Sequence, residues 1–145
     1  MTTWLRSALF NAFFFGFSAS YAALLLPLLV LPRSWLLQPI RFWARMIVAM
    51  LRPLCGIRVR VTGREHLPES GAALIAAKHQ SALETLALCT VFPEFAYILK
   101  RELLFIPVVG WHLSRGGMVA IDRTKGTRAM SLMNAAAADA IALGR

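Results

Sequence analysis

The first 64 residues contain no aspartate or glutamate, although they carry eight arginines. All seven acidic residues of the chain lie at or after Glu65, so the amino-terminal part is cationic without internal counter-charges. Such a segment attracts a polyanion, and anionic lipid headgroups and nucleic acid are two common ones. A nucleic-acid surface would cluster its basic residues without so much interleaved Leu, Phe and Val. The composition therefore favours membrane lipids as a partner and predicts no nucleic acid.

Cysteine and histidine are scarce. The two cysteines, Cys55 and Cys89, lie in apolar stretches without the C-x-x-C spacing of metal or redox sites. The histidines, His66, His79 and His112, form no ligand pattern with nearby acids. The sequence thus predicts two free thiols in a reducing compartment, no metal site and no tightly bound cofactor.

Apolar residues are abundant: they make up 58% of the 145 residues, and charged residues only 16%. Ser7 to Leu31 are 25 consecutive uncharged residues, enough to cross a hydrocarbon core that needs roughly 20. A cleaved signal peptide is the alternative, but the apolar run continues well past the small residues that would form a cleavage site. Gly16 and Pro27 each weaken an uninterrupted helix, so a broken or hairpin-like membrane element is also compatible with the pattern.

The arginines predict how this membrane element is oriented. Seven arginines follow Leu31 before Glu65, whereas only Arg6 precedes the apolar run. By the positive-inside rule, the body of the chain should face the cytoplasm at the cytoplasmic, or inner, membrane.

The next stretch, QPIRFWARMIVAMLRPLCG, predicts a helix with Pro39 in its first turn and an end near Pro53. Arg41, Arg45 and Arg52 fall within a narrow arc of that helix, which is typical of an interfacial helix. An ordinary core-facing helix with a solvated cationic face is the alternative. We place the membrane-associated helices in residues 1–55 and a second domain in residues 56–145.

The second domain has the pattern of an α/β sheet. IRVRVTG, at residues 57–63, alternates apolar and polar side chains, as a half-exposed strand at a sheet edge does. Three short apolar runs follow, at 72–77, 95–99 and 117–121, and the segments between them suit helices. This rhythm of strand, helix and strand predicts parallel strands.

Polar residues gather where these runs end. Those residues are Lys78, His79 and Ser81 after the first run, Lys100, Arg101 and Glu102 after the second, and Asp122 and Arg123 after the third. In a parallel sheet they would meet at the carboxyl edge, where open α/β sheets bind ligands. A site with several cations and one histidine suits an anionic substrate and a proton transfer.

Ser81 and Glu84 fit the S-x-x-E pattern of a capping box, in which each side chain bonds the other residue's backbone at the start of a helix. The cap accounts for Glu84 without any chemistry, and it makes Ser81 a cap and not a nucleophile. It does not account for His79, which stands at the expected strand end. The spacing alone leaves open whether His79 and Glu84 form a catalytic pair.

Three blocks of the sequence, HQSALET, KRELLFIPVVGW and GGMVAIDR, together resemble the glycerolipid acyltransferase family that includes 1-acylglycerol-3-phosphate acyltransferases. The resemblance covers roughly residues 55–145. The family's first block is usually H-x4-D, whereas this chain has His79 followed by Glu84, a longer carboxylate. The resemblance implies the first part of an α/β acyltransferase sheet, with the site at the strands' carboxyl ends and membrane-associated helices before it.

The resemblance also implies the reaction, which is part of phospholipid synthesis. An acyl group would pass from acyl-CoA or acyl carrier protein to the hydroxyl of lysophosphatidic acid, giving phosphatidic acid. His79 would be the general base, Glu84 would orient its ring, and Lys100 would polarise the site around the thioester carbonyl. Arg123 would bind the phosphate of the acceptor, and Gly117 would allow close approach of the backbone or simply end the preceding segment.

The family's third block, a strand leading into F-P-E-G-T-R, has no counterpart. KGTRAM at 125–130 shares three letters with it but lacks the Phe-Pro-Glu, and Thr127 is better explained as the cap of an Ala-rich helix that ends at Gly144. We therefore expect the chain to be the amino-terminal portion of a longer acyltransferase. The alternatives are a non-catalytic membrane-surface lipid-binding fragment and an acyltransferase acting on another lysolipid.

Overall fold

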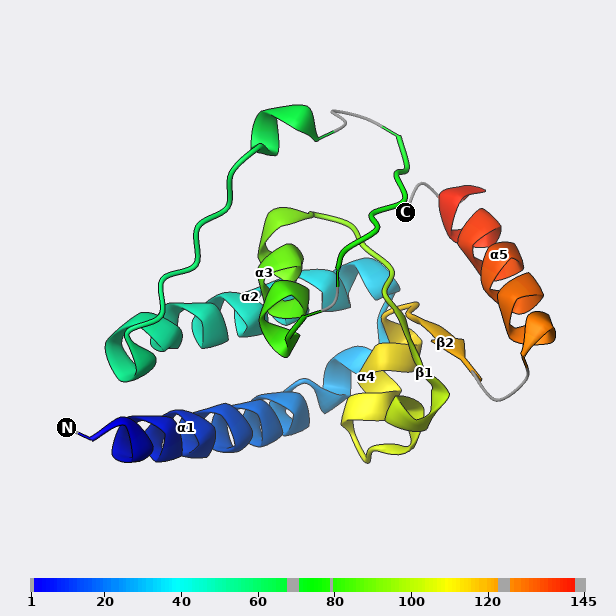
Figure 1. The fold of residues 1–145 in the computed structure, drawn as a ribbon. Coiled ribbons are helices and arrows are strands. Elements are labelled where there is room, and N and C mark those ends of the chain that lie inside the picture. Colours follow the sequence, from blue (N-terminus) through cyan, green and yellow to red (C-terminus); the bar gives the residue numbers. More distant parts are fainter. Residues whose placement is uncertain (1, 68–70, 79, 123–125, 143–145) are drawn as a thin grey trace.

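The computed structural model describes residues 2–67, 71–78, 80–122 and 126–142, and helices make up most of them (Figure 1). The α-helices are α1 (Thr3–Leu24), α2 (Arg33–Met50), α3 (Ala82–Val91), α4 (Val109–Arg115) and α5 (Thr127–Ala142). The short helical turns are η1 (Leu26–Val30), η2 (Leu51–Cys55), η3 (Arg64–His66) and η4 (Arg101–Phe105), of which η2 is π-helical. The strands are β1 (Ile98–Lys100) and β2 (Val119–Ile121).

Helix α1 is long and apolar enough to cross a membrane by length and composition, and none of its residues is buried. It ends before Pro27, which occupies the first turn of η1, because proline lacks the amide that a continuing helix needs. The apolar run at 7–31 thus forms one helix and a short 3-10 turn.

Helices α1 and α2 form an antiparallel hairpin, as their contacts show. The guanidinium of Arg6 donates from Nε to the carbonyl of Leu54 at 2.8 Å. Further along α1, Ser18 Oγ accepts from Trp43 Nε1 at 2.9 Å. Still later in α1, Tyr21 donates its hydroxyl to the carbonyl of Pro39 at 3.3 Å. Because later positions of α1 meet earlier positions of α2, the two helices run side by side in opposite directions.

Helix α2 starts at Arg33, so the prediction that Pro39 would lie in its first turn is wrong. The side chains of Leu36 and Leu37 are 0% and 1% exposed, and burying each stabilises the fold by about 1.5–3 kcal/mol. This gain offsets the cost of a proline inside the helix, about 3 kcal/mol. The predicted end near Pro53 is close to the observed one, since η2 continues to Cys55 and Gly56 then adopts a left-handed φ of 74°.

The core lies between α2, α3 and the segment that leads into β1. Its buried members are Leu37, Ala44, Cys89 and Phe95, with Ile40, Trp43, Phe92, Tyr97 and Met118 packed around them. Helix α2 is therefore a core-facing helix in which Arg41 is half-buried and Arg45 is exposed, and Arg52 is exposed on the following turn η2. An exposed basic face is common to both interpretations of the arginine stripe, the interfacial helix and the core-facing helix with a solvated face.

The two strands are parallel, as the sequence predicts. Ile98 pairs with Val119 and Lys100 pairs with Ile121. Helix α4 lies between the strands in sequence, and α3 precedes them. The expected alternation of strand and helix is therefore present from residue 82 to residue 121.

Two segments predicted to be strands are not strands. Residues 57–62 and 72–77 have no regular structure, and no described backbone hydrogen bond joins either segment to a neighbouring strand. Leu74 is 75% exposed and Ile75 is 46% exposed, so the apolar run that was predicted to be a strand lies at the surface. A strand needs a partner for its amides and carbonyls, and the described residues offer none here.

Candidate active site

The carboxyl ends of β1 and β2 lie side by side and bring polar residues together. Lys100 is the last residue of β1 and is exposed, and Asp122 follows the last residue of β2. Arg101 Nη1 lies 3.8 Å from Asp122 Oδ2, which links the two strand ends by an ion pair. Glu102 follows on the exposed turn η4. The strand-end residues thus balance two cations against two carboxylates.

Gly117 lies at the opposite edge of this small sheet. It precedes β2, whereas Lys100 and Asp122 lie at the carboxyl edge. Its φ of 72° is left-handed, and its amide donates to the carbonyl of Ser114 at 3.1 Å. Gly117 therefore ends helix α4, which is one of the two roles that the sequence suggested for it.

Ser81 and Glu84 form the predicted capping box at the start of α3. The Ser81 amide donates to both carboxylate oxygens of Glu84, at 3.1 and 3.0 Å, and the Ser81 hydroxyl accepts from the Leu83 amide at 3.1 Å. The hydroxyl also donates to Glu84 Oε2 at 2.9 Å. The cap holds this carboxylate against Ser81, which is two residues after the candidate base in the sequence. His79 itself, like Arg123, lies outside the described residues, so the His79–Glu84 pair stays a prediction.

A known protein family matches the part of the chain that contains these residues. The family model for Acyltransferase matches residues 58–144, which include His79, Glu84, Lys100 and Arg123. The chain belongs to the acyltransferase family. The resemblance seen in the three sequence blocks is thereby confirmed.

Several curated acyltransferases are similar to this chain. The 1-acyl-sn-glycerol-3-phosphate acyltransferase of Pseudomonas aeruginosa is 35% identical over 115 residues, which are 79% of this chain and 43% of that protein. The human 1-acyl-sn-glycerol-3-phosphate acyltransferase alpha is 35% identical over 91 residues, covering 62% of this chain and 32% of that protein. The 1-acyl-sn-glycerol-3-phosphate acyltransferase of Saccharomyces cerevisiae is 30% identical over 92 residues, which are 63% of this chain and 30% of that protein. This acyltransferase chain spans less than half the length of these relatives. No solved structure matches it.

In this acyltransferase domain, a half-buried tyrosine hydroxyl joins α3 to the segment before β1. Tyr97 donates its hydroxyl to the carbonyl of Thr85 at 2.8 Å, and the thiol of Cys89 lies 3.6 Å from the same hydroxyl. Burial raises the pKa of the Cys89 thiol, and burial also raises the pKa of Tyr97. Both groups are neutral at physiological pH and act as structural residues.

Sequence reasoning missed Arg33, which connects three distant parts of the chain. Its Nε donates to the carbonyl of Gly116, its Nη2 to the carbonyl of Phe95 and its Nη1 to Glu94 Oε2, each at 2.7 Å. These partners precede β2 and β1, so one guanidinium holds the amino ends of both strands against α2. The partners are 61 to 83 residues away in sequence, and no local pattern reveals them.

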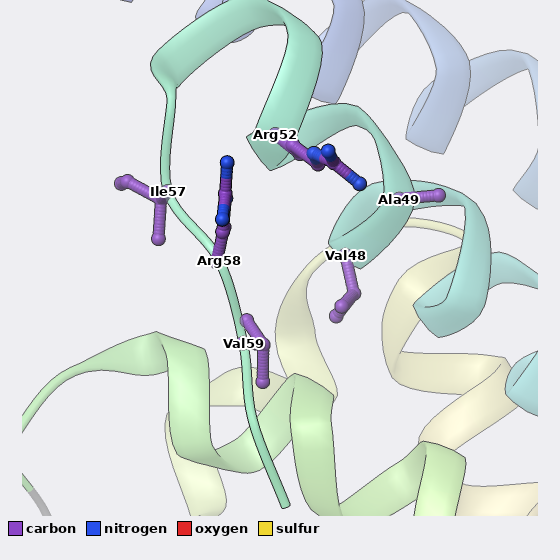
Figure 2. Close-up of a pocket in the computed structure, with 6 residues that line it drawn as sticks. All are labelled: Val48, Ala49, Arg52, Ile57, Arg58 and Val59. Atoms are coloured by element: carbon purple, nitrogen blue, oxygen red, sulfur yellow. The ribbon is translucent and has the colours of Figure 1, made fainter.

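A cationic groove lies at the far end of α2 (Figure 2). It has a volume of about 320 Å³ and is lined by Val48, Ala49, Arg52, Ile57, Arg58 and Val59. Figure 2 shows the side chains of Arg52 and Arg58 at one end of the groove, with Val48 and Val59 further along it. Both arginines are exposed, and neither is paired with a described carboxylate. The groove thus combines positive charge with apolar walls.

The described residues contain no group of three His, Cys, Asp or Glu side chains that is placed to hold a metal ion. Cys55 is half-buried and Cys89 is buried, and both are free thiols, as the sequence predicts. His66 lies in the short turn η3, whereas His112 is buried in α4 and hydrogen-bonded to the Val108 carbonyl at 2.8 Å.

Proposed function

We propose that this acyltransferase moves a fatty acyl group from acyl-CoA or acyl carrier protein to the free hydroxyl of lysophosphatidic acid. The product is phosphatidic acid, a precursor in phospholipid synthesis. The observation that carries the proposal is the family match over residues 58–144, because it contains every residue to which we assign a role. The names of the bacterial, human and yeast relatives support the choice of acceptor.

In the proposed mechanism, His79 removes the proton of the acceptor hydroxyl as its oxygen attacks the thioester carbonyl. The tetrahedral intermediate then expels the thiolate, which takes the proton from the imidazolium of His79. Glu84 orients the imidazole and stabilises its charged form, a role for which the capping box fixes it at the start of α3. No acyl-enzyme forms, because the acceptor itself is the nucleophile.

In the proposal, two cationic side chains stabilise the negative charges of the reactants. Lys100, exposed at the end of β1, stabilises the negative charge that develops on the carbonyl oxygen. Arg123 binds the phosphate of the acceptor, since a guanidinium forms two parallel hydrogen bonds with such an anion. Gly117 supports the site indirectly by ending α4 before β2.

The α1–α2 hairpin supports attachment to the cytoplasmic face of the inner membrane. Helix α1 offers an apolar surface, whereas α2 runs beside it with Arg45 exposed, and Arg52 is exposed on the following turn η2. If α1 crossed the bilayer, its partner would carry Arg45 toward the hydrocarbon core, at a cost of roughly 2.5 kcal/mol or more for a charge placed at the centre. In the proposal the hairpin lies along the bilayer surface, with α1 in the apolar region and the arginines among the headgroups.

An acyl-transfer assay tests the proposed function. The purified protein in phosphatidylcholine vesicles receives acyl-CoA and lysophosphatidic acid, and both free CoA and phosphatidic acid are measured. We expect phosphatidic acid to form, and His79→Ala to lower the rate by about 10²-fold or more while vesicle binding is unchanged. Equal rates for the two proteins, or no product from either, would favour a non-catalytic lipid-binding protein. In a competition assay, acyl transfer to another lysolipid that lysophosphatidic acid fails to inhibit would indicate that the other lysolipid is the acceptor.

A further inference from the structure

Five large apolar side chains are exposed together on η4 and α4. They are Leu103, Phe105, Ile106, Val109 and Trp111, with exposed fractions of 40, 71, 43, 38 and 55%. We call this surface the η4–α4 patch. Single exposed apolar residues are ordinary, but several within nine residues of chain mark an interaction surface.

The backbone of the patch is held in a strained, compact turn. Val108 has a φ of 65°, which β-branched residues rarely adopt. On either side of it, the Val109 amide donates to the Pro107 carbonyl and the Gly110 amide donates to the Ile106 carbonyl, both at 2.7 Å. A turn so constrained presents Phe105 and Ile106 outward in a fixed arrangement, and strain of this kind is often found at functional surfaces.

The patch adjoins the end of the long apolar helix. Arg115 Nη2 donates to the carbonyl of Leu31 at 2.9 Å, and a groove of about 390 Å³ lies between Leu29 and Trp111. Val30, on the same turn η1, is 82% exposed. Figure 1 shows α1 and the turn between η4 and α4 on the same side of α2, along the lower edge of the molecule. The backbones of helix α1 and of the patch therefore lie on one side of α2.

The charges around the patch suit an anionic lipid surface. Lys100 and Arg101 precede it, Arg115 follows it, and all three are exposed. Two carboxylates accompany these three cations, Glu102 and the Asp122 that pairs with Arg101, so the rim keeps an excess of one positive charge. An apolar centre with aromatic side chains and a basic rim is the composition of segments that enter the boundary between headgroups and acyl chains.

We infer that the η4–α4 patch is a second membrane contact, which enters the same leaflet of an anionic bilayer as α1. This contact would bring the carboxyl end of β1, which η4 directly follows, close to the lipid surface. The inference rests on exposure and charge, and it does not depend on the acyl-transfer reaction.

Three almost equally exposed positions allow a matched test. They are Phe15 on α1, 68% exposed, Phe105 in the patch, 71%, and Leu74, 75%, in the irregular segment above α2 in Figure 1. Each is replaced by cysteine in a Cys55→Ser, Cys89→Ala background and labelled with a nitroxide. Collision with oxygen, which concentrates in lipid, is compared with collision with a water-soluble nickel complex in phosphatidylcholine vesicles containing phosphatidylglycerol.

The inference requires the labels at 15 and 105 to favour oxygen and the label at 74 to favour nickel. It also requires Phe105→Ser to weaken vesicle binding by about tenfold or more, with Leu74→Ser unchanged. A label at 105 that matches the label at 74 overturns the inference. Spin–spin broadening at 105 that disappears on dilution with unlabelled chain would show a second copy on the patch, and shielding from both reagents would show a protein cover. Either result also overturns it.

Discussion

The guanidinium of Arg33 and the carboxylate of Glu94 lie 2.7 Å apart, joining the start of α2 to the segment before β1. The Arg33 side chain is 16% exposed and also donates to two backbone carbonyls, whereas Glu94 is 48% exposed. The arginine therefore contributes more to the fold than the ion pair alone does. Removing it would leave the carbonyls of Phe95 and Gly116 without their donor.

We expect Arg33→Ala to lower the free energy of unfolding by about 2–4 kcal/mol, because a largely buried charged donor leaves three acceptors unpaired. Glu94→Gln should cost about 1 kcal/mol or less, since that partner is half in water. Urea unfolding in detergent, followed by circular dichroism, measures both. Arg64→Ala, on the exposed turn η3, is the control. Equal losses from Arg33→Ala and Glu94→Gln would show that only the ion pair matters.

Local patterns predicted part of this molecule well. The capping box of Ser81 and Glu84 depends on residues three apart, and the parallel pairing of 98–100 with 119–121 follows from two apolar runs separated by a helix. The prediction of strands at 57–62 and 72–77 was wrong. Alternation and apolarity report only which side chains of a segment can be buried. A strand also needs a neighbour, and that information lies elsewhere in the chain.

The start of α2 and the role of Arg33 were missed for a related reason. Complete burial of Leu36 against the rest of the fold extends the helix before Pro39, a tertiary effect that outweighs the local preference. The bonds of Arg33 reach residues more than 60 positions away. The catalytic assignment of His79 comes from the family resemblance and not from the fold.

The cap and the proposed chemistry of Glu84 are separable by substitution. Ser81→Ala should lower the free energy of unfolding by about 1 kcal/mol and leave acyl transfer within a few-fold, because the hydroxyl's bonds are lost but the backbone amide at position 81 still holds the Glu84 carboxylate. Glu84→Gln should keep most of the cap, since glutamine also serves in capping boxes, but lower the rate by about 10²-fold if a carboxylate must stabilise the imidazolium of His79. Rate assays and thermal unfolding on the same samples check both. Full activity in Glu84→Gln would leave Glu84 as a cap alone.

Alkaline pH should destabilise the fold through Cys89 and Tyr97. Burial raises both pKa values above their ordinary values of 9.0 and 10.0, so the folded chain keeps protons that the unfolded chain releases. The stability that they contribute is complete below the unfolded pKa and is lost as pH rises above it. The free energy of unfolding should therefore fall from about pH 9 upward, by at most about 1.4 kcal/mol per pH unit for each group.

The variant Cys89→Ala isolates the first of these two groups. Its stability should fall less steeply than that of the original protein between about pH 8.5 and 10, because the thiol ionises first in the unfolded chain. Urea unfolding at several pH values measures the difference. Parallel curves for the two proteins would show that Cys89 does not contribute to the alkaline loss.

The groove between the end of α2 and residues 57–59 should bind anionic lipid through its two arginines. Each basic side chain near a membrane surface contributes about 1 kcal/mol, so Arg52→Gln with Arg58→Gln should weaken binding to phosphatidylglycerol vesicles roughly thirtyfold. A matched double variant, Lys78→Gln with Arg64→Gln, removes the same charge from exposed positions outside the groove. Vesicle sedimentation compares the two. Equal losses would mean that net charge, and not the groove, determines the affinity.

Two glycines of this chain should respond in opposite ways to alanine. A Cβ on Gly110 would overlap the backbone carbonyl of Leu104, which a rigid turn holds in place, whereas Gly16 in α1 has open space around it. Gly110→Ala should therefore lower the free energy of unfolding by about 1–3 kcal/mol or more. Gly16→Ala should raise it by about 0.5–1 kcal/mol, since alanine restricts the unfolded chain and favours the helix. Thermal unfolding in the same detergent checks both signs. A neutral Gly110→Ala would show that the turn at Leu104 can move to admit a methyl group at little cost.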